Sequence, residues 1–454
     1  MIAPEKFSRR ALMVLAILAG GILGYGLFRL PLHQTGLASY ASYLGLPAFA
    51  AILFGLSTRL RPDSRMVVLI CTVATVGSLY AAEIYLTYVD PRFDRLPAVP
   101  TDGVDRRSKM EVVYDERRLG RDAWPYASPD YIKVVDAGNR IHSPLSIADT
   151  EVWPFGFAAN VTTVVCREGR DWLVYRTDEH GFNNPSGLWS ADTDILFLGD
   201  SYTHGECVPR ERSFVGLVRG RFPKTLTLGA SSTGPLIALA TLKEYGAILR
   251  PREVFWVFFE GNDLDDLASE LRSPLLGRYR NNNFRQNLLD HQEAIDRAWK
   301  IELNRRIAEA GRNANREQSR VFGNVVRLQT VRNVLRLSHP RQQPVRQELV
   351  RLLGDLLEDA RQTTESWGGR LHFVYLPSPY RYHSRYQAIP MRDLHEQVRA
   401  QVRGRRLPIV DIVDTFARAA EEPLALYQGH LTEAGNRIVA DAILDHLSGR
   451  HPHE

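Results

Sequence analysis

The sequence predicts an α/β protein whose main domain has three layers, α/β/α, around a five-stranded parallel sheet, preceded by three transmembrane helices. Three observations predict it. Long apolar runs fill much of the first ninety positions, short apolar runs alternate with helical periodicity from Asp194 onward, and polar segments with glycine follow directly after several of the short runs. Alternation of strand-like and helix-like segments is typical of βαβ units and of a parallel sheet.

The long N-terminal apolar runs are each about as long as the twenty residues that cross a bilayer. They are Ala11–Phe28, Leu37–Leu56 and Met66–Tyr88. A cleaved signal peptide is the competing interpretation of the first run, because basic residues precede it. Two further runs follow at once, so we expect an uncleaved bundle.

Basic residues beside the runs predict the orientation. Arg29 alone lies between the first two runs, whereas three basic residues precede the first run and three lie between the second and third: Lys6, Arg9, Arg10, Arg59, Arg61 and Arg65. The positive-inside rule then places the N-terminus in the cytoplasm. Three crossings put everything after Tyr88 in the periplasm, with the inner membrane as a partner. Glu83 fits an interfacial position better than a functional intramembrane acid.

Composition narrows the class of protein. The chain has 454 residues, of which 44% are hydrophobic and 24% charged, which excludes disorder, collagen and a disulfide miniprotein. The net charge of +5 could indicate nucleic-acid binding, but the excess is concentrated in one insertion outside the cytoplasm. No nucleic-acid partner is therefore expected.

We predict three parts: a membrane anchor over residues 1–90, a lead-in subdomain over 91–191 and the α/β domain over 192–454. The lead-in subdomain is rich in Pro, Asp, Arg and aromatic residues. Cys166 and Cys207 lie in the exported part, where an oxidising compartment permits a disulfide. The sequence does not decide between that disulfide and two unpaired buried thiols.

The predicted elements of the α/β domain follow in order. The strands are Ile195–Leu198, Leu226–Leu228, Val254–Phe259, Leu371–Leu376 and Ile409–Val413. The helices are Phe214–Phe222, Pro235–Leu249, Val345–Trp367, Met391–Val402 and Thr432–Leu447. Between the third and fourth strands lies a helical insertion, Leu267–Arg346, which opens in a loop at Asn281–Asn283.

The insertion carries sixteen Lys and Arg residues against seven Asp and Glu residues. Four apolar residues form an amphipathic stripe in it: Leu328, Val331, Leu335 and Leu337. One interpretation is a lid or a surface for an acidic polymer or lipid headgroups. The other is a solvated insertion whose stripe packs on the α/β core.

Ligands of open parallel sheets bind beyond the carboxyl ends of the strands, so the residues there deserve inspection. Ser201 follows the first strand and opens a helix, which suits a nucleophile. Gly234 follows the second strand and offers a backbone N–H. Asn262 follows the third strand and offers a side-chain amide N–H. His430 comes just before the last helix. A serine, a base and oxyanion donors are what acyl transfer through a covalent intermediate requires.

These blocks resemble the SGNH, or GDSL-type, hydrolase superfamily over Asp194–Ser448, which implies its flavodoxin-like fold. By motif, Ser201 in "FLGDSYTHG" matches the nucleophile, and His430 in "QGHLTEAGNRIVADAI" matches the general base. Ser201, Gly234 in "LGASSTGP" and Asn262 in "FFEGNDLDD" match the oxyanion-hole donors. The segment "YRTDEHGFNNP" resembles the lead-in of exported, polysaccharide-associated members.

One departure from the family pattern matters. The family has an Asp three residues before the histidine to orient its imidazole, and Tyr427 stands there. Three accounts follow: a Ser/His dyad held by a backbone carbonyl, a domain that binds without turnover, or a substitute carboxylate. The candidates for that substitute are Asp411, Asp414, Glu421 and Glu422.

Other polar residues near the motifs have less specific roles. Asp200 is expected to shape the turn through backbone hydrogen bonds, and His204 to line the entrance. Asp263, with its acidic neighbours Asp265 and Asp266, is expected to be a solvated loop acid and not a metal ligand. Four residues after the fourth strand could bind a sugar or simply close a loop: Tyr380, Arg381, Tyr382 and His383.

The sequence thus predicts a membrane-anchored periplasmic serine esterase without cofactor or metal, removing O-acyl groups such as acetyl from a cell-envelope or exported polysaccharide. Three alternatives remain open. The first is an O-acyltransferase that works with a membrane acyltransferase partner. The second is a catalytically silent glycan-binding or assembly factor. The third is a lysophospholipase or thioesterase, for which the basic insertion is the best support.

Overall fold

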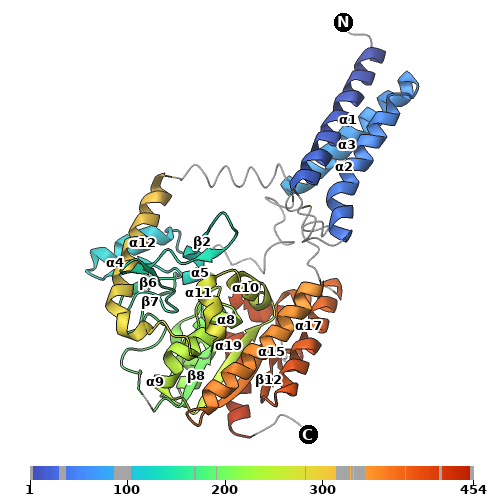
Figure 1. Ribbon diagram of the computed structural model, residues 1–454. Coiled ribbons are helices and arrows are strands. Elements are labelled where there is room, and N and C mark those ends of the chain that lie inside the picture. The colour runs from blue at the N-terminus through green and yellow to red at the C-terminus, as the bar shows by residue number, and fades with distance from the viewer. Residues whose placement is uncertain are drawn as a thin grey trace. The chain divides into compact units, whose positions relative to one another are not determined.

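The structure is a computed structural model that describes residues 4–29, 37–85, 104–167, 170–190, 192–281, 283–312, 328, 331, 343–383, 385–418 and 422–449. It divides into two compact units (Figure 1). Unit 1 comprises residues 1–95 and 312–346, and unit 2 comprises residues 96–311 and 347–454. Each unit is described by itself.

Unit 1 contains the N-terminal helices α1 (Pro4–Arg29), α2 (Leu37–Ser57) and α3 (Pro62–Ile84). Two helical segments among the described residues are long and apolar enough to cross a membrane, Glu5–Tyr25 and Pro62–Ile84. The second predicted span, Leu37–Leu56, is corrected, because α2 contributes only the shorter apolar stretch Pro47–Ser57, which starts at a proline inside the helix.

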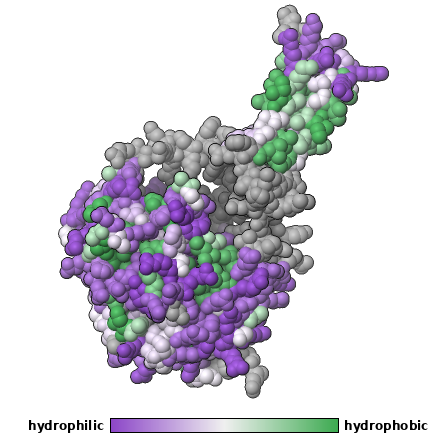
Figure 2. Space-filling view, in the orientation of Figure 1, coloured by the Kyte–Doolittle hydropathy of each residue, from purple (hydrophilic) through white to green (hydrophobic). Residues whose placement is uncertain are grey.

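Figure 2 shows apolar side chains along these helices and hydrophilic side chains at one end of them. Ile17 and Val73 are 73% and 72% exposed. Such side chains are stabilised when lipid or protein covers them. Glu83, in contrast, is buried in unit 1, where its Oε2 accepts a hydrogen bond of 2.7 Å from the Val331 N–H. The predicted interfacial position of Glu83 stays a prediction.

Unit 2 is built on a five-stranded parallel sheet of order β12-β11-β10-β8-β9. The strands are β8 (Ile195–Leu198), β9 (Thr225–Thr227), β10 (Glu253–Phe259), β11 (Arg370–Leu376) and β12 (Ile409–Asp411). In chain order this is the doubly wound arrangement 2-1-3-4-5, which reverses direction between β8 and β10. The α/β class and the five parallel strands are confirmed.

Alternate residues of the central strands face two separate cores. Leu196 and Leu198 lie in one core, and Ile195 and Phe197 lie in the other. The first core is covered by α8 (Pro235–Thr241), α15 (Gln343–Glu365) and α17 (Arg385–Gly404). The second is covered by α7 (Phe214–Arg219), α18 (Ile412–Arg418) and α19 (Glu433–Leu447). Burial on both faces explains why the central strands are largely apolar.

Most predicted elements differ from the observed ones at their ends. The strand predicted over Ile409–Val413 ends at Asp411, because Ile412 already begins α18. The helix predicted over Pro235–Leu249 is interrupted by a π-helical turn at Leu242–Gly246 before α9 (Ala247–Leu249). Lys243 within that turn is buried and donates to the Tyr279 carbonyl at 2.9 Å and to Asp359 at 3.2 Å.

The segment before the sheet belongs to the same compact unit. It contains α4 (Lys109–Arg118), α5 (Pro129–Ile132) and the three-stranded sheet β1-β6-β7, and its strands are β1 (Ala123–Pro125), β6 (Thr162–Val164) and β7 (Val174–Arg176). Two hairpins complete it: β2–β3 (Val134–Val135, Ile141–His142) and β4–β5 (Ser146–Ile147, Thr150–Glu151). The boundary between residues 191 and 192 stays a prediction.

A disulfide joins Cys166, just after β6, to Cys207. This settles the choice that the sequence left open between a disulfide and two thiols. The bond links the lead-in segment covalently to the loop that follows the first strand of the large sheet.

Much of the predicted insertion belongs to unit 2. Its described part contains α10 (Asp263–Glu270), α11 (Pro274–Gly277), η5 (Arg278–Arg280), η6 (Leu288–His291) and α12 (Gln292–Arg312). Trp299 and Leu303 of α12 lie in the first core. Leu335 and Leu337 of the predicted stripe lie outside the described residues, so the role of that stripe stays a prediction.

Candidate functional site

Ser201 stands at a sharp turn between β8 and the short helix α6 (Ser201–His204). Gly199 has φ +154°, and a Cβ there would lie 2.3 Å from Thr203 Oγ1 and 2.8 Å from the Val257 carbonyl. Only glycine therefore fits at this position. Asp200 caps α6 by accepting the Tyr202 N–H at 3.0 Å. The turn thus presents Ser201 at the first position of the helix, and the role predicted for Asp200 agrees with this geometry.

His430 meets Ser201 from a different segment. It lies in a small hairpin formed by β13 (Tyr427–Gln428) and β14 (His430–Leu431), with Gly429 at φ +84° between the strands. His430 Nε2 is 2.9 Å from Ser201 Oγ. The Tyr202 ring lies tilted against the imidazole, with ring centroids 5.0 Å apart, and its hydroxyl is 3.4 Å from the Gly429 carbonyl. Serine and histidine are therefore within hydrogen-bond reach, as a nucleophile and its base must be.

Tyr427 does not replace the expected aspartate. Its ring is buried and its hydroxyl donates to the Pro377 carbonyl, so it anchors the hairpin to the core. Asp411 is not the substitute carboxylate, because it interacts with other residues. Its carboxylate is 2.8 Å from His395 Nε2 and 3.4 Å from Arg399 Nε. Asp414 and Glu422 are exposed, and Glu421 lies outside the described residues.

The three predicted oxyanion donors differ in availability. Ser201 is the first residue of α6, where a backbone N–H has no partner within the helix. Asn262 donates one N–H to Asp266 Oδ2 at 2.8 Å, and a side-chain amide carries two. The single N–H of Gly234 donates to the buried Glu270, which also accepts the Leu236 N–H at 2.9 Å. Gly234 is therefore not an oxyanion donor. It is the N-cap of α8, and Glu270 accepts the N–H groups at the start of that helix.

Four carboxyl groups lie beside Ser201 and along α10, of which Asp200, Asp263 and Glu270 are buried and Asp266 is half-buried. Burial, followed by repulsion from neighbouring acids, raises the pKa of Asp266 to about 7 and that of Asp263 well above its usual range. Burial also raises the pKa of Asp200 to about 7 and that of Glu270 to about 8, although backbone N–H groups oppose the shift. Asp263 is therefore corrected from a solvated loop acid to a buried group that accepts the Phe259 N–H at 3.0 Å.

His204 does not line an entrance. It is 3% exposed, its Nε2 is 2.6 Å from the Tyr175 hydroxyl, and its ring stacks on Tyr126 at a centroid distance of 4.8 Å. Burial lowers the pKa of His204 to about 4, so it is neutral at physiological pH. Its contacts make it part of the packing between the lead-in segment and the turn after Ser201.

Glu206 is the residue that the sequence reasoning missed. Its Oε2 is 3.9 Å from His430 Nε2 and accepts the Ser231 hydroxyl at 2.6 Å. Ser231 also contacts the Tyr126 hydroxyl, which is 3.2 Å from both its backbone nitrogen and its Oγ. The sequence feature that could have pointed to Glu206 is its position directly before Cys207, in the turn that ends α6.

Of the four residues predicted at the rim after the fourth strand, Arg381 is internal and Tyr382 is half-buried, and the side chain of His383 lies outside the described ones. Arg381 is 9% exposed and pairs with the fully buried side chain of Glu260, which also accepts the Tyr375 hydroxyl at 2.8 Å. Arg381 is therefore corrected from a sugar-binding candidate to a structural ion pair. Tyr380 is 55% exposed and remains available at the surface.

Among the described residues, one group has the spacing of metal ligands: Cys166, Glu206 and Cys207. Its two sulfur atoms are joined in the disulfide, so the thiolates that would bind a cation are absent.

Comparison with solved structures finds similar folds over a little more than half of the chain. A structure described as TesA shares 11% identity and covers 57% of this chain and 99% of its own, with a TM-score of 0.32. A lipase/acylhydrolase from Enterococcus faecalis shares 14% identity. The match covers 57% of this chain and 98% of the acylhydrolase, with a TM-score of 0.31. A catalytic mutant of Axe2, an acetylxylan esterase from Geobacillus stearothermophilus, shares 12% identity. The match covers 57% of this chain and 95% of Axe2, with a TM-score of 0.32.

No family model matches the chain, and no curated protein matches it. The function is therefore argued from the side chains of this chain.

The buried acids predict how stability depends on pH. A carboxyl group whose folded-state pKa lies above its unfolded value stabilises the fold fully at low pH, and this contribution is lost as pH rises through the folded pKa. For Asp266 this stabilisation is lost as the pH rises from about 4, near the unfolded pKa, to about 7, the folded pKa. Asp266→Asn should therefore stabilise unit 2 at pH 8 by at least about 1 kcal/mol, the value of roughly one pKa unit, and change little at pH 4.

Thermal unfolding at both pH values measures this difference. Asp265→Asn, on the exposed side of the same helix, is the matched control and should behave as wild type at both. Equal unfolding temperatures for Asp266→Asn and wild type at pH 8 would contradict the raised pKa of Asp266.

Proposed function

We propose that this chain is a serine esterase of SGNH type, and the observation that carries the proposal is the 2.9 Å contact between Ser201 Oγ and His430 Nε2. Ser201 Oγ attacks the ester carbonyl carbon while His430 Nε2 takes the hydroxyl proton. The carbon–oxygen bond of the ester then breaks, and the leaving alcohol takes the proton from the imidazolium. Water, activated by His430, hydrolyses the acyl-serine and releases the acid.

Two N–H groups are available as donors for the oxyanion of the tetrahedral intermediate in this proposal. The Ser201 backbone N–H begins α6, and the second amide N–H of Asn262 is not needed for its bond to Asp266. Such preorganised donors stabilise charge that develops in the transition state. Gly234 is left out of this set because its N–H is bonded to Glu270.

Glu206 supports the base in this mechanism. When His430 takes the serine proton it becomes a cation, and the Glu206 carboxylate 3.9 Å from Nε2 stabilises that cation. The side chain of Glu206 is 11% exposed, so water screens the attraction only in part. The bond from Ser231 Oγ and the disulfide at the next residue hold the carboxylate in place.

As the substrate we propose O-acyl groups, such as acetyl, on a cell-envelope or exported polysaccharide. Two features support this: the disulfide, which fits an exported unit, and the resemblance of Tyr175–Pro185 to the lead-in of exported family members. The same dyad could pass the acyl group to a sugar hydroxyl in place of water, so the assay must measure both products.

The first prediction concerns serine reactivity. A fluorophosphonate should label the wild-type chain at Ser201, and Ser201→Ala should abolish both labelling and hydrolysis of p-nitrophenyl acetate. His430→Ala should lower both by about 10³-fold or more, because the base that activates the serine is lost. Mass spectrometry of the labelled peptide identifies the site.

Ser186→Ala, at an exposed serine outside the site, is the matched control and should label as wild type. Labelling that persists in Ser201→Ala, or a folded wild type that neither labels nor turns over, would refute the esterase proposal. Acylated glycan exceeding released acid in the presence of an acceptor would instead show transfer.

The second prediction concerns Glu206. Glu206→Gln removes the charge but keeps the acceptor for Ser231, so kcat should fall about tenfold while KM changes little. The acid limb of the kcat/KM profile should shift to lower pH by about one unit, because the imidazolium loses a stabilising carboxylate. Among the described residues, other titratable groups that interact with Glu206 or His430 include Lys109, Tyr126, Tyr131, Tyr175, Asp200, Tyr202 and His204.

Glu211→Gln, at an exposed glutamate in the following 3-10 turn, should leave both the rate and the profile unchanged. A purely structural role for Glu206 would lower kcat without moving the acid limb.

We also propose that the N-terminal helices anchor the chain in the inner membrane, with unit 2 in the periplasm. The apolar surfaces of α1 and α3 and the disulfide in unit 2 support this arrangement.

Counting reactive thiols tests the side of the membrane. The chain has three cysteines, so denatured protein from non-reducing cell extracts should take one maleimide-polymer adduct, at Cys71, and three after reduction. Cys166→Ser should take two adducts without reduction, because Cys207 is then free. Three adducts on the wild type without reductant would place unit 2 in a reducing compartment.

A further inference from the structure

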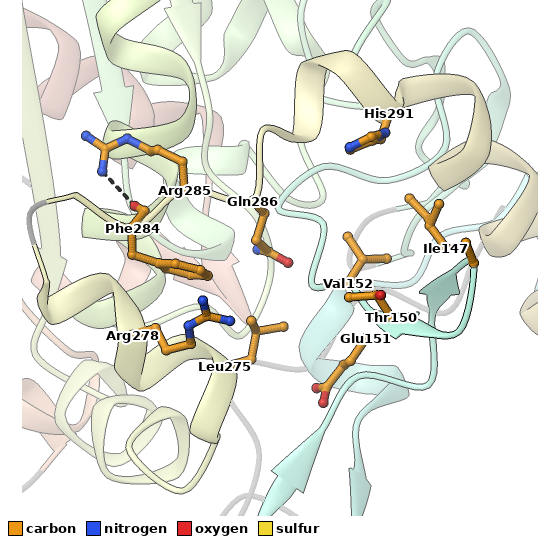
Figure 3. Close-up of a pocket in the computed structure, with 11 residues that line it drawn as sticks. Ile147, Thr150, Glu151, Val152, Leu275, Arg278, Phe284, Arg285, Gln286 and His291 are labelled. Atoms are coloured by element: carbon orange, nitrogen blue, oxygen red, sulfur yellow. Dashed lines mark hydrogen bonds between the residues drawn. The ribbon is translucent and has the colours of Figure 1, made fainter.

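A second candidate binding site lies away from Ser201 and His430, in a cavity of about 440 Å³ within unit 2 (Figure 3). Its volume falls in the range that small-molecule ligands occupy. We call it the arginine cavity, and its lining residues are Ile147, Ala148, Thr150, Glu151, Val152, Leu275, Arg278, Phe284, Arg285, Gln286 and His291.

Two segments form opposite walls of the arginine cavity. Leu275, Arg278 and Phe284 lie on one side in Figure 3, and Ile147 and Val152 lie on the other. The second wall is the hairpin β4–β5, whose two turn residues Ala148 and Asp149 have φ of 46° and 62°. Two successive positive φ values give the turn that fits a tight hairpin, although alanine adopts such a conformation at a cost.

Gln286 forms a fixed floor between the two walls. Its Oε1 accepts the Trp153 N–H at 2.9 Å, and its Nε2 donates to the Trp153 carbonyl at 3.1 Å and to the Tyr279 hydroxyl at 2.8 Å. Both of its N–H groups are thereby used. Gln286 therefore shapes the cavity but has no amide donor left for a ligand.

The single acid in the lining is neutralised within the fold. Glu151 Oε1 accepts the Ser143 N–H at 2.8 Å, and its Oε2 is 3.1 Å from His142 Nδ1. Arg278, in contrast, has no carboxylate within ion-pair distance in the described part of the chain, and its guanidinium lies 3.9 Å from the centre of the Phe284 ring. Arg285 donates to the Phe284 carbonyl at 2.7 Å, and His291 is exposed at the same cavity.

We propose that the arginine cavity binds a small organic anion, a carboxylate carried on an apolar body. Arg278 would hold the carboxylate through charge-assisted hydrogen bonds, supported by Arg285 and His291. Leu275, Val152 and the edge of Phe284 would cover the apolar body. The lining leaves few neutral hydrogen-bonding groups, which disfavours a sugar and favours a ligand that is apolar apart from its charged end.

Fluorine NMR titration of the full chain in nanodiscs tests this proposal. The probe is para-(trifluoromethyl)benzoate, and the corresponding neutral benzamide has the same shape without the charge. The benzoate should bind and the benzamide should bind at least about tenfold more weakly, because a hydrogen bond to a charged group is lost. Equal affinities would overturn the proposal.

Arg278→Gln should weaken benzoate binding about tenfold or more. Arg278→Lys keeps the charge but loses the planar guanidinium, so its affinity for benzoate should lie between those of wild type and Arg278→Gln. Arg280→Gln is the matched control, because Arg280 is exposed in the same turn and does not line the cavity. Wild-type affinity in Arg278→Gln would also overturn the proposal.

Two further ligands distinguish the source of the anion. Phenyl phosphate that binds more tightly than the benzoate would assign the cavity to phosphate esters and overturn the carboxylate assignment. Inorganic phosphate that displaces the probe at equal concentration would overturn the need for an apolar body. Binding is measured without reference to ester hydrolysis, so failure of the esterase proposal and failure of this one give separate results.

Discussion

The hydrogen bond between Ser201 Oγ and His430 Nε2 is the contact on which the proposed chemistry depends, and it joins residues 229 positions apart. Two backbone features make it possible. Gly199 lets the chain turn directly from β8 into α6, where a Cβ would collide with the Val257 carbonyl. Gly429 closes the hairpin that carries His430. Both turns need conformations that glycine adopts at little cost, so the backbone places the two side chains before any substrate arrives.

The surroundings of this contact are unusually rich in buried acids. Asp200, Asp263, Asp266 and Glu270 all have pKa values raised by burial, so the fold holds protons that the unfolded chain would release at neutral pH. The carboxyls accept backbone and amide N–H groups: Glu270 caps α8, and Asp200 caps α6. The acids therefore work as structural acceptors, and they leave Glu206 as the carboxylate placed beside the imidazole.

The lead-in segment completes the site. Tyr126 reaches Ser231, Ser231 reaches Glu206, and Tyr175 reaches His204. The disulfide fixes the same loop covalently. Because these contacts come from residues before the first strand of the large sheet, the α/β domain alone would lack the support that positions Glu206.

The sequence by itself determined the α/β class, all five parallel strands and the pair Ser201 and His430, because most strands are largely apolar and each motif residue follows a strand end or begins a helix. It did not determine which N–H groups stay unoccupied, which acids are buried or what lies beside the imidazole. Gly234, Asp263, His204 and Arg381 received other roles once their neighbours were known. Hydrogen-bond partners and burial depend on residues far apart in the chain, and Glu206 reaches His430 only because the tertiary structure folds the loop after α6 against β14.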